Sequence, residues 1–136
     1  MKIPKASKLD LKFHCSKRVL RSCKKSKQHN VSSQCQNVMK VISLFPERGV
    51  SIPRFSKLRK MRVPLPHLSV GKSGGYRLIY RTSIIDEIRY VVFLEVYFKG
   101  KKDDLTSGEY SELLNESEEI LEDPLSFDWD DQPKLS

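Results

Sequence analysis

Residues 71–81 decide the fold of this chain, and they read Gly71-Lys72-Ser73-Gly74-Gly75-Tyr76-Arg77-Leu78-Ile79-Tyr80-Arg81. The three glycines permit positive φ and close approach of another backbone, so they predict a tight turn. The residues after the turn alternate in type, which predicts a strand whose side chains point to two faces in turn. Tyr76, Leu78 and Tyr80 would face the core, and the two arginines would face solvent. A glycine turn beside Lys72 and two arginines indicates an anion-binding surface.

Two further segments, residues 58–65 and residues 90–99, alternate in the same way. The connection at residues 83–89 is too short for a crossover helix, so it predicts an antiparallel pair of strands. If the three strands are neighbours, their polar rows meet on one surface of the sheet. That surface would pool Lys60, Arg62, Arg77, Arg81, Glu95, Tyr97 and Lys99.

The remaining elements follow from periodicity and from stop signals. Residues 8–14 alternate as a strand, residues 16–26 and 31–45 have helical spacing, and residues 46–56 form a linker. Thr106 and Glu109 form a capping box that opens a last helix. We expect an α+β fold in the order β-α-α-β-β-β-α, with about four mostly antiparallel strands. The two N-terminal helices would pack on one face, leaving the other as an open basic face.

Charge divides the chain into two parts. Residues 1–81 hold 20 Lys and Arg against 2 Asp and Glu, whereas residues 82–136 hold 5 against 15. A basic region of this size indicates a polyanionic partner such as nucleic acid. We expect a flexible basic N-terminus at residues 1–7, one domain at residues 8–121, and an acidic, disordered tail at residues 122–136. An alternative for the tail is that it folds back on the basic face as a nucleic-acid mimic.

Composition also argues against several classes of protein. The three cysteines, Cys15, Cys23 and Cys35, have neither Cys-x-x-Cys nor zinc-site spacing, so we expect reduced thiols and no metal or other cofactor. The glycine turn lacks the upstream glycine of a Walker loop. No apolar run approaches the ~20 residues that span a bilayer, and we expect a cytoplasmic protein with no membrane contact.

Three spaced motifs, KMRVPLP, GKSGGYRLIY and VVFLEVYFKGKKDDLT, occur at residues 60–66, 71–80 and 91–106. Together they resemble the RelE/ParE superfamily of toxin-antitoxin toxins, in the branch with a KIR, GKSGGYRVIY and IYAKxEKxDL pattern. The resemblance covers about residues 57–114, with weaker agreement back to Val31. It identifies residues 8–121 as a RelE-like toxin domain of a type II toxin-antitoxin system.

The resemblance implies a metal-independent endoribonuclease, an mRNA interferase that cuts messenger RNA at the ribosome and inhibits translation. It also implies a cognate antitoxin protein as partner. Phosphoryl transfer needs mainly positioning and cations around the phosphate. The matching catalytic positions are Lys72, Arg77, Tyr97 and Lys99, and the RNA-binding positions are Lys60, Arg62, Arg81, Lys101 and Lys102. Lys72 would bind phosphate or act as base; Glu95 departs from the family pattern, and His67 is a further candidate for proton transfer.

Two other functions fit the same sequence. One is a non-catalytic module that binds RNA or protein on the same fold. The other is a ParE-like poison of DNA gyrase, which needs no phosphate chemistry and would block supercoiling.

Overall fold

The computed structural model describes residues 9–25, 31–64 and 75–135. In these residues five strands form one sheet in the order β1-β5-β4-β3-β2, and three α-helices pack on it. The α+β fold expected from the sequence is confirmed, with one strand more because residues predicted as linker contain β2. The elements are β1 (Asp10–Cys15), α1 (Lys17–Lys25), α2 (Val31–Leu44), β2 (Val50–Ile52), β3 (Phe55–Val63), β4 (Tyr76–Ile85), β5 (Ile88–Phe98), α3 (Ser107–Glu122) and the 3-10 helix η3 (Pro124–Ser126).

Strand pairing is antiparallel except at one edge of the sheet. β1 runs parallel to β5, while β5, β4, β3 and β2 pair antiparallel in turn. The antiparallel β4–β5 connection predicted from its length is confirmed, but the turn is only Asp86 and Glu87. Both have positive φ, 50° and 67°, which matches the right-handed twist of the paired strands.

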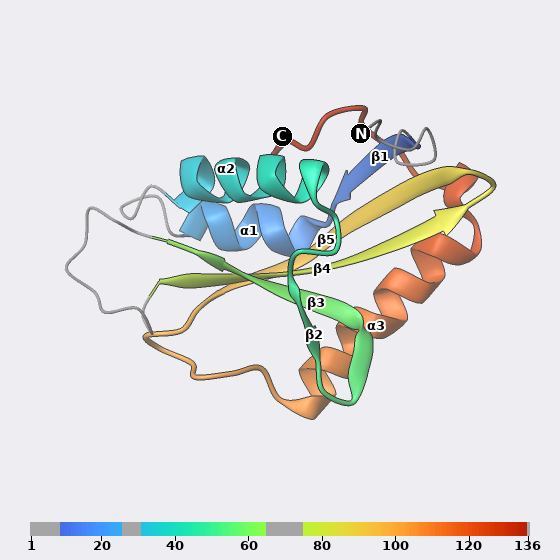
Figure 1. The fold of residues 1–136 in the computed structure, drawn as a ribbon. Helices are drawn as coiled ribbons and strands as arrows, with labels where there is room; N and C mark the ends of the chain where they lie inside the picture. The colour runs from blue at the N-terminus through green and yellow to red at the C-terminus, as the bar shows by residue number, and fades with distance from the viewer. Residues whose placement is uncertain (1–8, 26–30, 65–74, 136) are drawn as a thin grey trace, which may run out of the picture.

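The helices cover both faces of the sheet (Figure 1). α1 and α2 pack on one face, over a core that includes Phe13, Leu78 and Phe93. α3 packs on the other face, over a second core that includes Ile79 and Leu94. The expectation of an open basic face is therefore wrong for the part that α3 covers. Residues 76–81 of β4 are buried on both sides.

The α3 helix begins where its capping signal predicts. The Thr106 hydroxyl accepts a hydrogen bond from the Glu109 backbone N–H at 3.1 Å, and the Glu109 carboxylate accepts one from the Thr106 N–H at 2.9 Å. Such a box satisfies two amides that the first turn leaves without helical partners. Tyr110, Leu113 and Leu121 then recur on the face that α3 turns toward the sheet. The cap thus fixes which part of the sheet α3 covers.

A tyrosine of β4 ties the end of α2 to the sheet. The Tyr80 hydroxyl donates a hydrogen bond to the Pro46 carbonyl at 2.8 Å and accepts one from the Gly49 N–H at 2.9 Å. A Cβ at Gly49 would lie 2.7 Å from the Tyr80 ring, so only glycine allows this approach. The segment after α2 is held in place to enter β2.

Residues 123–135, expected to be disordered, pack along β1 instead. Phe13 and Asp130 exchange two backbone hydrogen bonds of 2.9 and 2.8 Å, and Trp129 lies 4.6 Å from Tyr90, centroid to centroid. The proposed fold-back as a nucleic-acid mimic would place this segment on the basic row of the sheet. The structure has it at the Tyr90 end of β5, and Tyr97 lies seven residues further on, roughly 23 Å along an extended strand.

No helix in the described part of the chain is both long enough and apolar enough to cross a membrane. The predicted flexible N-terminus, residues 1–7, lies outside the described residues.

Candidate nucleic-acid interface

Three adjacent strands bring Arg62, Arg77 and Tyr97 into one row. In the sheet register Arg62 of β3 is opposite Arg77 of β4, and Arg77 is opposite Tyr97 of β5. Side chains of directly opposed residues lie about 5 Å apart at Cβ. All three belong to the face that carries α3, but α3 covers mainly the part of that face beyond Ile79. We call these three residues the arginine–tyrosine row.

Arg77 is the central member of this row and is largely buried. The residue keeps 7% of its surface exposed, and its guanidinium donates a hydrogen bond to the Tyr76 carbonyl at 3.3 Å. Burial, followed by the positive charge of Arg62, lowers the pKa of Arg77 from its ordinary value. Two adjacent guanidinium groups repel each other, so an anion placed between them relieves that repulsion.

Tyr97 closes the row on the β5 side. It keeps 8% of its surface exposed, and among the described residues its hydroxyl makes no hydrogen bond of full geometry, although its interaction with the Lys60 ammonium helps to raise the Lys60 pKa. A buried hydroxyl without a partner is unfavourable by about 1–3 kcal/mol, and a ligand oxygen would remove that penalty. The sequence already predicted a role for Tyr97, but only the structure shows that its hydroxyl is buried.

Lys60 lies beside the row but is engaged with the loop before α3. Its ammonium is 3.0 Å from the Asp104 carboxylate, and lies 5.8 Å from the Tyr97 ring centroid and 5.7 Å from that of Tyr110. Burial opposes the charge on Lys60, but hydrogen bonding to Tyr110 and Asp104 outweighs it and raises the Lys60 pKa. Likewise, burial alone would raise the pKa of Asp104, yet hydrogen bonds from Tyr110 and Lys60 hold it below its ordinary value. Lys60 thus adds positive charge next to the row while anchoring the loop.

Arg81 points to the same face as Arg77 but lies under α3. Its guanidinium is 3.0 Å from the Ser117 hydroxyl and 3.1 Å from the Glu118 carboxylate. Lys57 contacts the same carboxylate at 3.0 Å. The sequence placed Arg81 on an exposed RNA-binding surface, and the structure instead has it 8% exposed and paired with a helix. Strand alternation alone could not reveal that a helix docks there.

Glu95 is not on the arginine–tyrosine face, contrary to the sequence prediction. The β4–β5 register shifts between Ile79 and Tyr80, so β5 carries an extra residue at this point. As a result Glu95 points toward α1, where its carboxylate accepts a hydrogen bond from the Ser22 hydroxyl at 2.8 Å. It therefore neither neutralises Arg77 nor serves as a base beside it.

The lysines after β5 lie at the edge of the row. The backbone N–H of Lys99 donates to the Gly75 carbonyl at 3.0 Å, which holds Lys99 against the end of the glycine turn. Lys101 is exposed, and Lys102 pairs with Glu109 of the α3 cap. Lys72 and His67 lie outside the described residues. β3 ends at Val63, directly after Arg62, and β4 begins at Tyr76, directly before Arg77.

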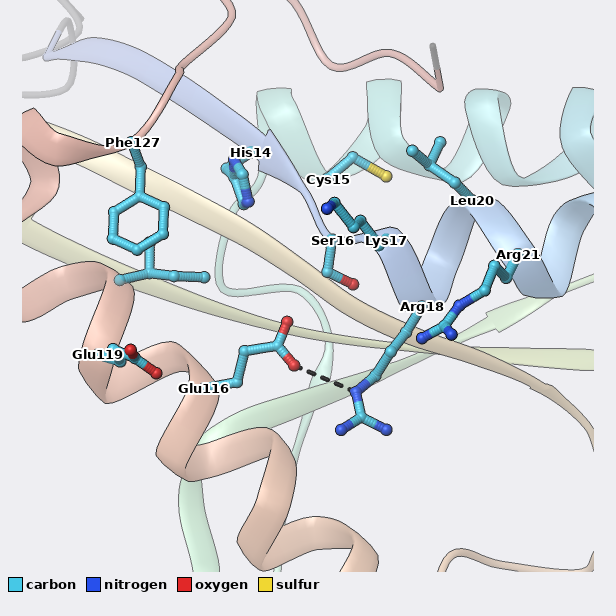
Figure 2. Close-up of a pocket in the computed structure, with 11 residues that line it drawn as sticks. His14, Cys15, Ser16, Lys17, Arg18, Leu20, Arg21, Glu116, Glu119 and Phe127 are labelled. Atoms are coloured by element: carbon cyan, nitrogen blue, oxygen red, sulfur yellow. Dashed lines mark hydrogen bonds and ion pairs between the residues drawn. The ribbon is translucent and has the colours of Figure 1, made fainter.

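A separate cavity lies between the end of β1, α1 and α3 (Figure 2). It measures about 600 Å³, and Lys17, Arg21 and Glu119 lie around it. Arg18 bridges it through a 3.1 Å ion pair to Glu116. No member of the arginine–tyrosine row lines this cavity, so the two sites are separate.

No family model matches this sequence, and a search of curated proteins finds no relative. Within residues 9–25, 31–64 and 75–135, no group of three or more His, Cys, Asp or Glu side chains is arranged to hold a metal ion. What the described site offers is a row of cations and one phenol, which can bind a phosphate and stabilise charge that develops on it.

Proposed function

We propose that this protein is a RelE-like toxin that cleaves messenger RNA on the ribosome, with the arginine–tyrosine row holding the phosphate at the cut. The motifs in residues 57–114 supply the reaction class. The main support for the site is the register, which aligns Arg62, Arg77 and Tyr97 on three adjacent strands. Two guanidinium groups and a phenol suit the non-bridging oxygens of one phosphate.

In the proposed reaction the ribose 2′-hydroxyl attacks the neighbouring phosphorus. A bond forms from phosphorus to the 2′ oxygen, and the bond to the 5′ oxygen of the next nucleotide breaks. The products are a 2′,3′-cyclic phosphate and a free 5′-hydroxyl. Negative charge grows on the non-bridging oxygens in the transition state, and the planar fork of Arg77 with Arg62 stabilises it. Tyr97 donates its hydroxyl proton in a hydrogen bond to the same oxygens.

Lys72 and Lys99 complete the proposed catalytic set. Lys72 lies within the glycine-rich segment of the sequence, and the Lys99 backbone N–H donates to the carbonyl of Gly75, the last glycine of that segment. An ammonium there would neutralise the phosphate, and Lys72 would either bind the phosphate or accept the 2′ proton. Lys60, Arg62 and Lys101 would hold flanking RNA backbone, and Lys102 would extend that path.

The same proposal includes where the toxin acts and which partner silences it. The toxin would act on ribosomes in the cytoplasm, and a cognate antitoxin would silence it by covering the arginine–tyrosine row. An acidic antitoxin segment suits the row because Arg62 and Arg77 bring two positive charges to adjacent strands.

A second function is favoured by the burial of the row. Arg77 and Tyr97 each keep less than a tenth of their surface exposed, which is little access for a reacting phosphate. A non-catalytic module would need only the rim of the row, with Arg62 and Lys101 binding RNA backbone. Both functions use Arg62 and Lys101 as RNA contacts, and they differ in whether Arg77 and Tyr97 also hold a phosphate at which RNA is cut.

Translating ribosomes distinguish these functions. They are incubated with wild type, with Arg77→Ala, and with Lys40→Ala, which removes the same charge from the exposed surface of α2, and new RNA 5′ ends are mapped. We expect cuts with wild type and Lys40→Ala and none with Arg77→Ala. Ribosome binding without cuts would favour the non-catalytic module. Cuts that persist in Arg77→Ala would overturn the proposed site, and inhibition of gyrase supercoiling without either effect would support the ParE-like alternative.

A further inference from the structure

Two cysteines that the proposed function does not use face each other between α1 and α2. The sulfurs of Cys23 and Cys35 are 3.8 Å apart, and the residues are only 3% and 0% exposed. Both belong to the core under the two N-terminal helices. We propose that Cys23 and Cys35 form a modification site at which peroxide closes a reversible disulfide between α1 and α2.

The geometry requires only a small movement. A disulfide holds its sulfurs about 2.05 Å apart, so the gap must close by less than about 2 Å. The two residues lie on neighbouring helices and are separated by eleven residues, 24–34, in the sequence. Thiols are the groups that peroxides oxidise most readily in proteins, first to a sulfenic acid. A second thiol already in contact then resolves that acid into a disulfide.

The surroundings decide which sulfur reacts first. Hydrogen bonding from Cys35 lowers the pKa of Cys23, an effect that burial opposes and Ser32 reinforces. The same Cys23–Cys35 interaction and burial raise the pKa of Cys35. Cys23 is therefore the thiol that ionises more easily, and the thiolate is the nucleophile in such oxidations.

The chemistry balances with peroxide as the oxidant. The Cys23 thiolate attacks one peroxide oxygen and the O–O bond breaks, which gives the Cys23 sulfenic acid and hydroxide. Cys35 sulfur then attacks the Cys23 sulfur, the S–S bond forms, and the sulfenic oxygen leaves as water with the Cys35 proton. In total two thiols lose two electrons, and one peroxide with two protons becomes two waters.

Cys15 provides an internal control within the same chain. It is only half-buried and lines the cavity of about 600 Å³ (Figure 2), so it is the more accessible thiol. Burial, with smaller contributions from Cys23 and Asp130, raises the pKa of Cys15 to about 12. Oxidation governed by access alone would select Cys15, whereas oxidation governed by the thiol pair would select Cys23 and Cys35.

The test uses the reduced full-length protein. It is treated with hydrogen peroxide, denatured, and alkylated, and then analysed by intact mass and by peptide mapping without reductant. We expect two of the three thiols to resist alkylation, a mass loss of about 2 Da before alkylation, and a peptide pair joined through Cys23 and Cys35. Dithiothreitol should restore all three thiols, and no disulfide-linked dimer should form.

Cysteine variants give a second test of which two residues form the bridge, in addition to the wild-type peptide map. Cys15→Ser should form the same bridge at the same rate, whereas Cys23→Ser and Cys35→Ser should form no intramolecular bridge. If either buried variant fails to fold, the wild-type peptide map still identifies the bonded residues. Three alkylatable thiols after peroxide, dimers joined through Cys15, or oxidation that stops at Cys15 would each overturn the proposal.

Discussion

Arg77 and Arg81 lie four residues apart on the same face of β4, and both keep less than a tenth of their surface exposed. Their neighbours differ in charge. Arg81 meets the Ser117 hydroxyl and the Glu118 carboxylate of α3, whereas Arg77 lies opposite another arginine, Arg62, in the register. The fold thus places a carboxylate beside Arg81 and a second guanidinium opposite Arg77. The same residue type serves packing at one position and, in our proposal, phosphate binding at the other.

We expect Arg77→Lys to have the largest effect, because it keeps the charge at this position and removes the planar fork of the guanidinium. We expect cleavage on the ribosome to slow by about 100-fold, the size of effect seen when one donor to a transition-state oxygen is lost. The melting temperature should change little. The measurement is a single-turnover cleavage rate, with Arg81→Lys, which retains a cation near Glu118, as the matched control. Equal losses in both variants would mean that Arg77 has no special role.

Arg81→Ala tests the other end of the strand. It removes a charged hydrogen bond and a buried side chain, so we expect the free energy of unfolding to fall by about 2 kcal/mol. Urea denaturation measures this change, and the cleavage rate of the folded variant should stay near that of wild type. Lys57→Ala is the control: it contacts the same Glu118 carboxylate from an exposed position, and we expect a change below about 0.5 kcal/mol. If Arg81→Ala slowed cleavage without lowering stability, Arg81 would belong with Arg77 in the phosphate site and not in the packing of α3.

Some of this arrangement follows directly from the sequence. The spacing of apolar residues predicted α2, and the Thr106–Glu109 capping box predicted the start of α3, because both signals act within one or two turns of chain. Alternation in residues 76–81 correctly placed Arg77 and Arg81 on one face of β4. Local patterns of this kind sufficed for the elements other than β2 and for the placement of Arg62 and Arg77 in one row.

Other features depend on pairing or docking that a local pattern does not contain. The extra residue in β5 turned Glu95 to the opposite face, and strict alternation has no way to signal such a bulge. The β4–β5 turn uses Asp86 and Glu87 at positive φ without the glycine that normally marks such a turn. The docking of α3 over Arg81 is a tertiary event between segments about 36 residues apart.

The prediction that the acidic tail, residues 122–136, is disordered was wrong for a related reason. Its composition is typical of a disordered segment, but Trp129 and Phe127 pack against the second core and the backbone at Asp130 pairs with β1. β1 is an edge strand, and an unpaired edge offers backbone groups to any extended segment that reaches it. Two aromatic residues are enough to anchor the tail there, which composition averaged over the segment conceals.

Asp104→Asn tests the loop that lies beside the row. Hydrogen bonds from Tyr110 and Lys60 hold the Asp104 pKa below its ordinary value of 3.8 even though burial raises it. A carboxyl with a lowered folded pKa stabilises the protein above its unfolded pKa, and this contribution is lost as the pH falls through the folded value. We expect the variant to lose about 1 kcal/mol at pH 7, allowing for solvent screening of this partly exposed pair. The difference should vanish in denaturation curves recorded well below pH 3.8; a constant difference across that range would show that charge is not the cause.

Arg62→Ala is the mildest change to the row and tests whether the row meets a phosphate at all. Arg62 is the exposed member, so its removal should weaken RNA binding only a few-fold while Arg77 keeps its place. Each cation that neutralises a phosphate of single-stranded nucleic acid releases a counterion, so the logarithm of affinity against the logarithm of salt should lose about 0.7 from its slope. Binding titrations at several salt concentrations measure this slope. Lys40→Ala, on the opposite helical layer, removes an equal charge and should leave the slope unchanged. If both variants change it equally, RNA senses only the net charge of the domain, and Arg62 makes no defined phosphate contact beside Arg77.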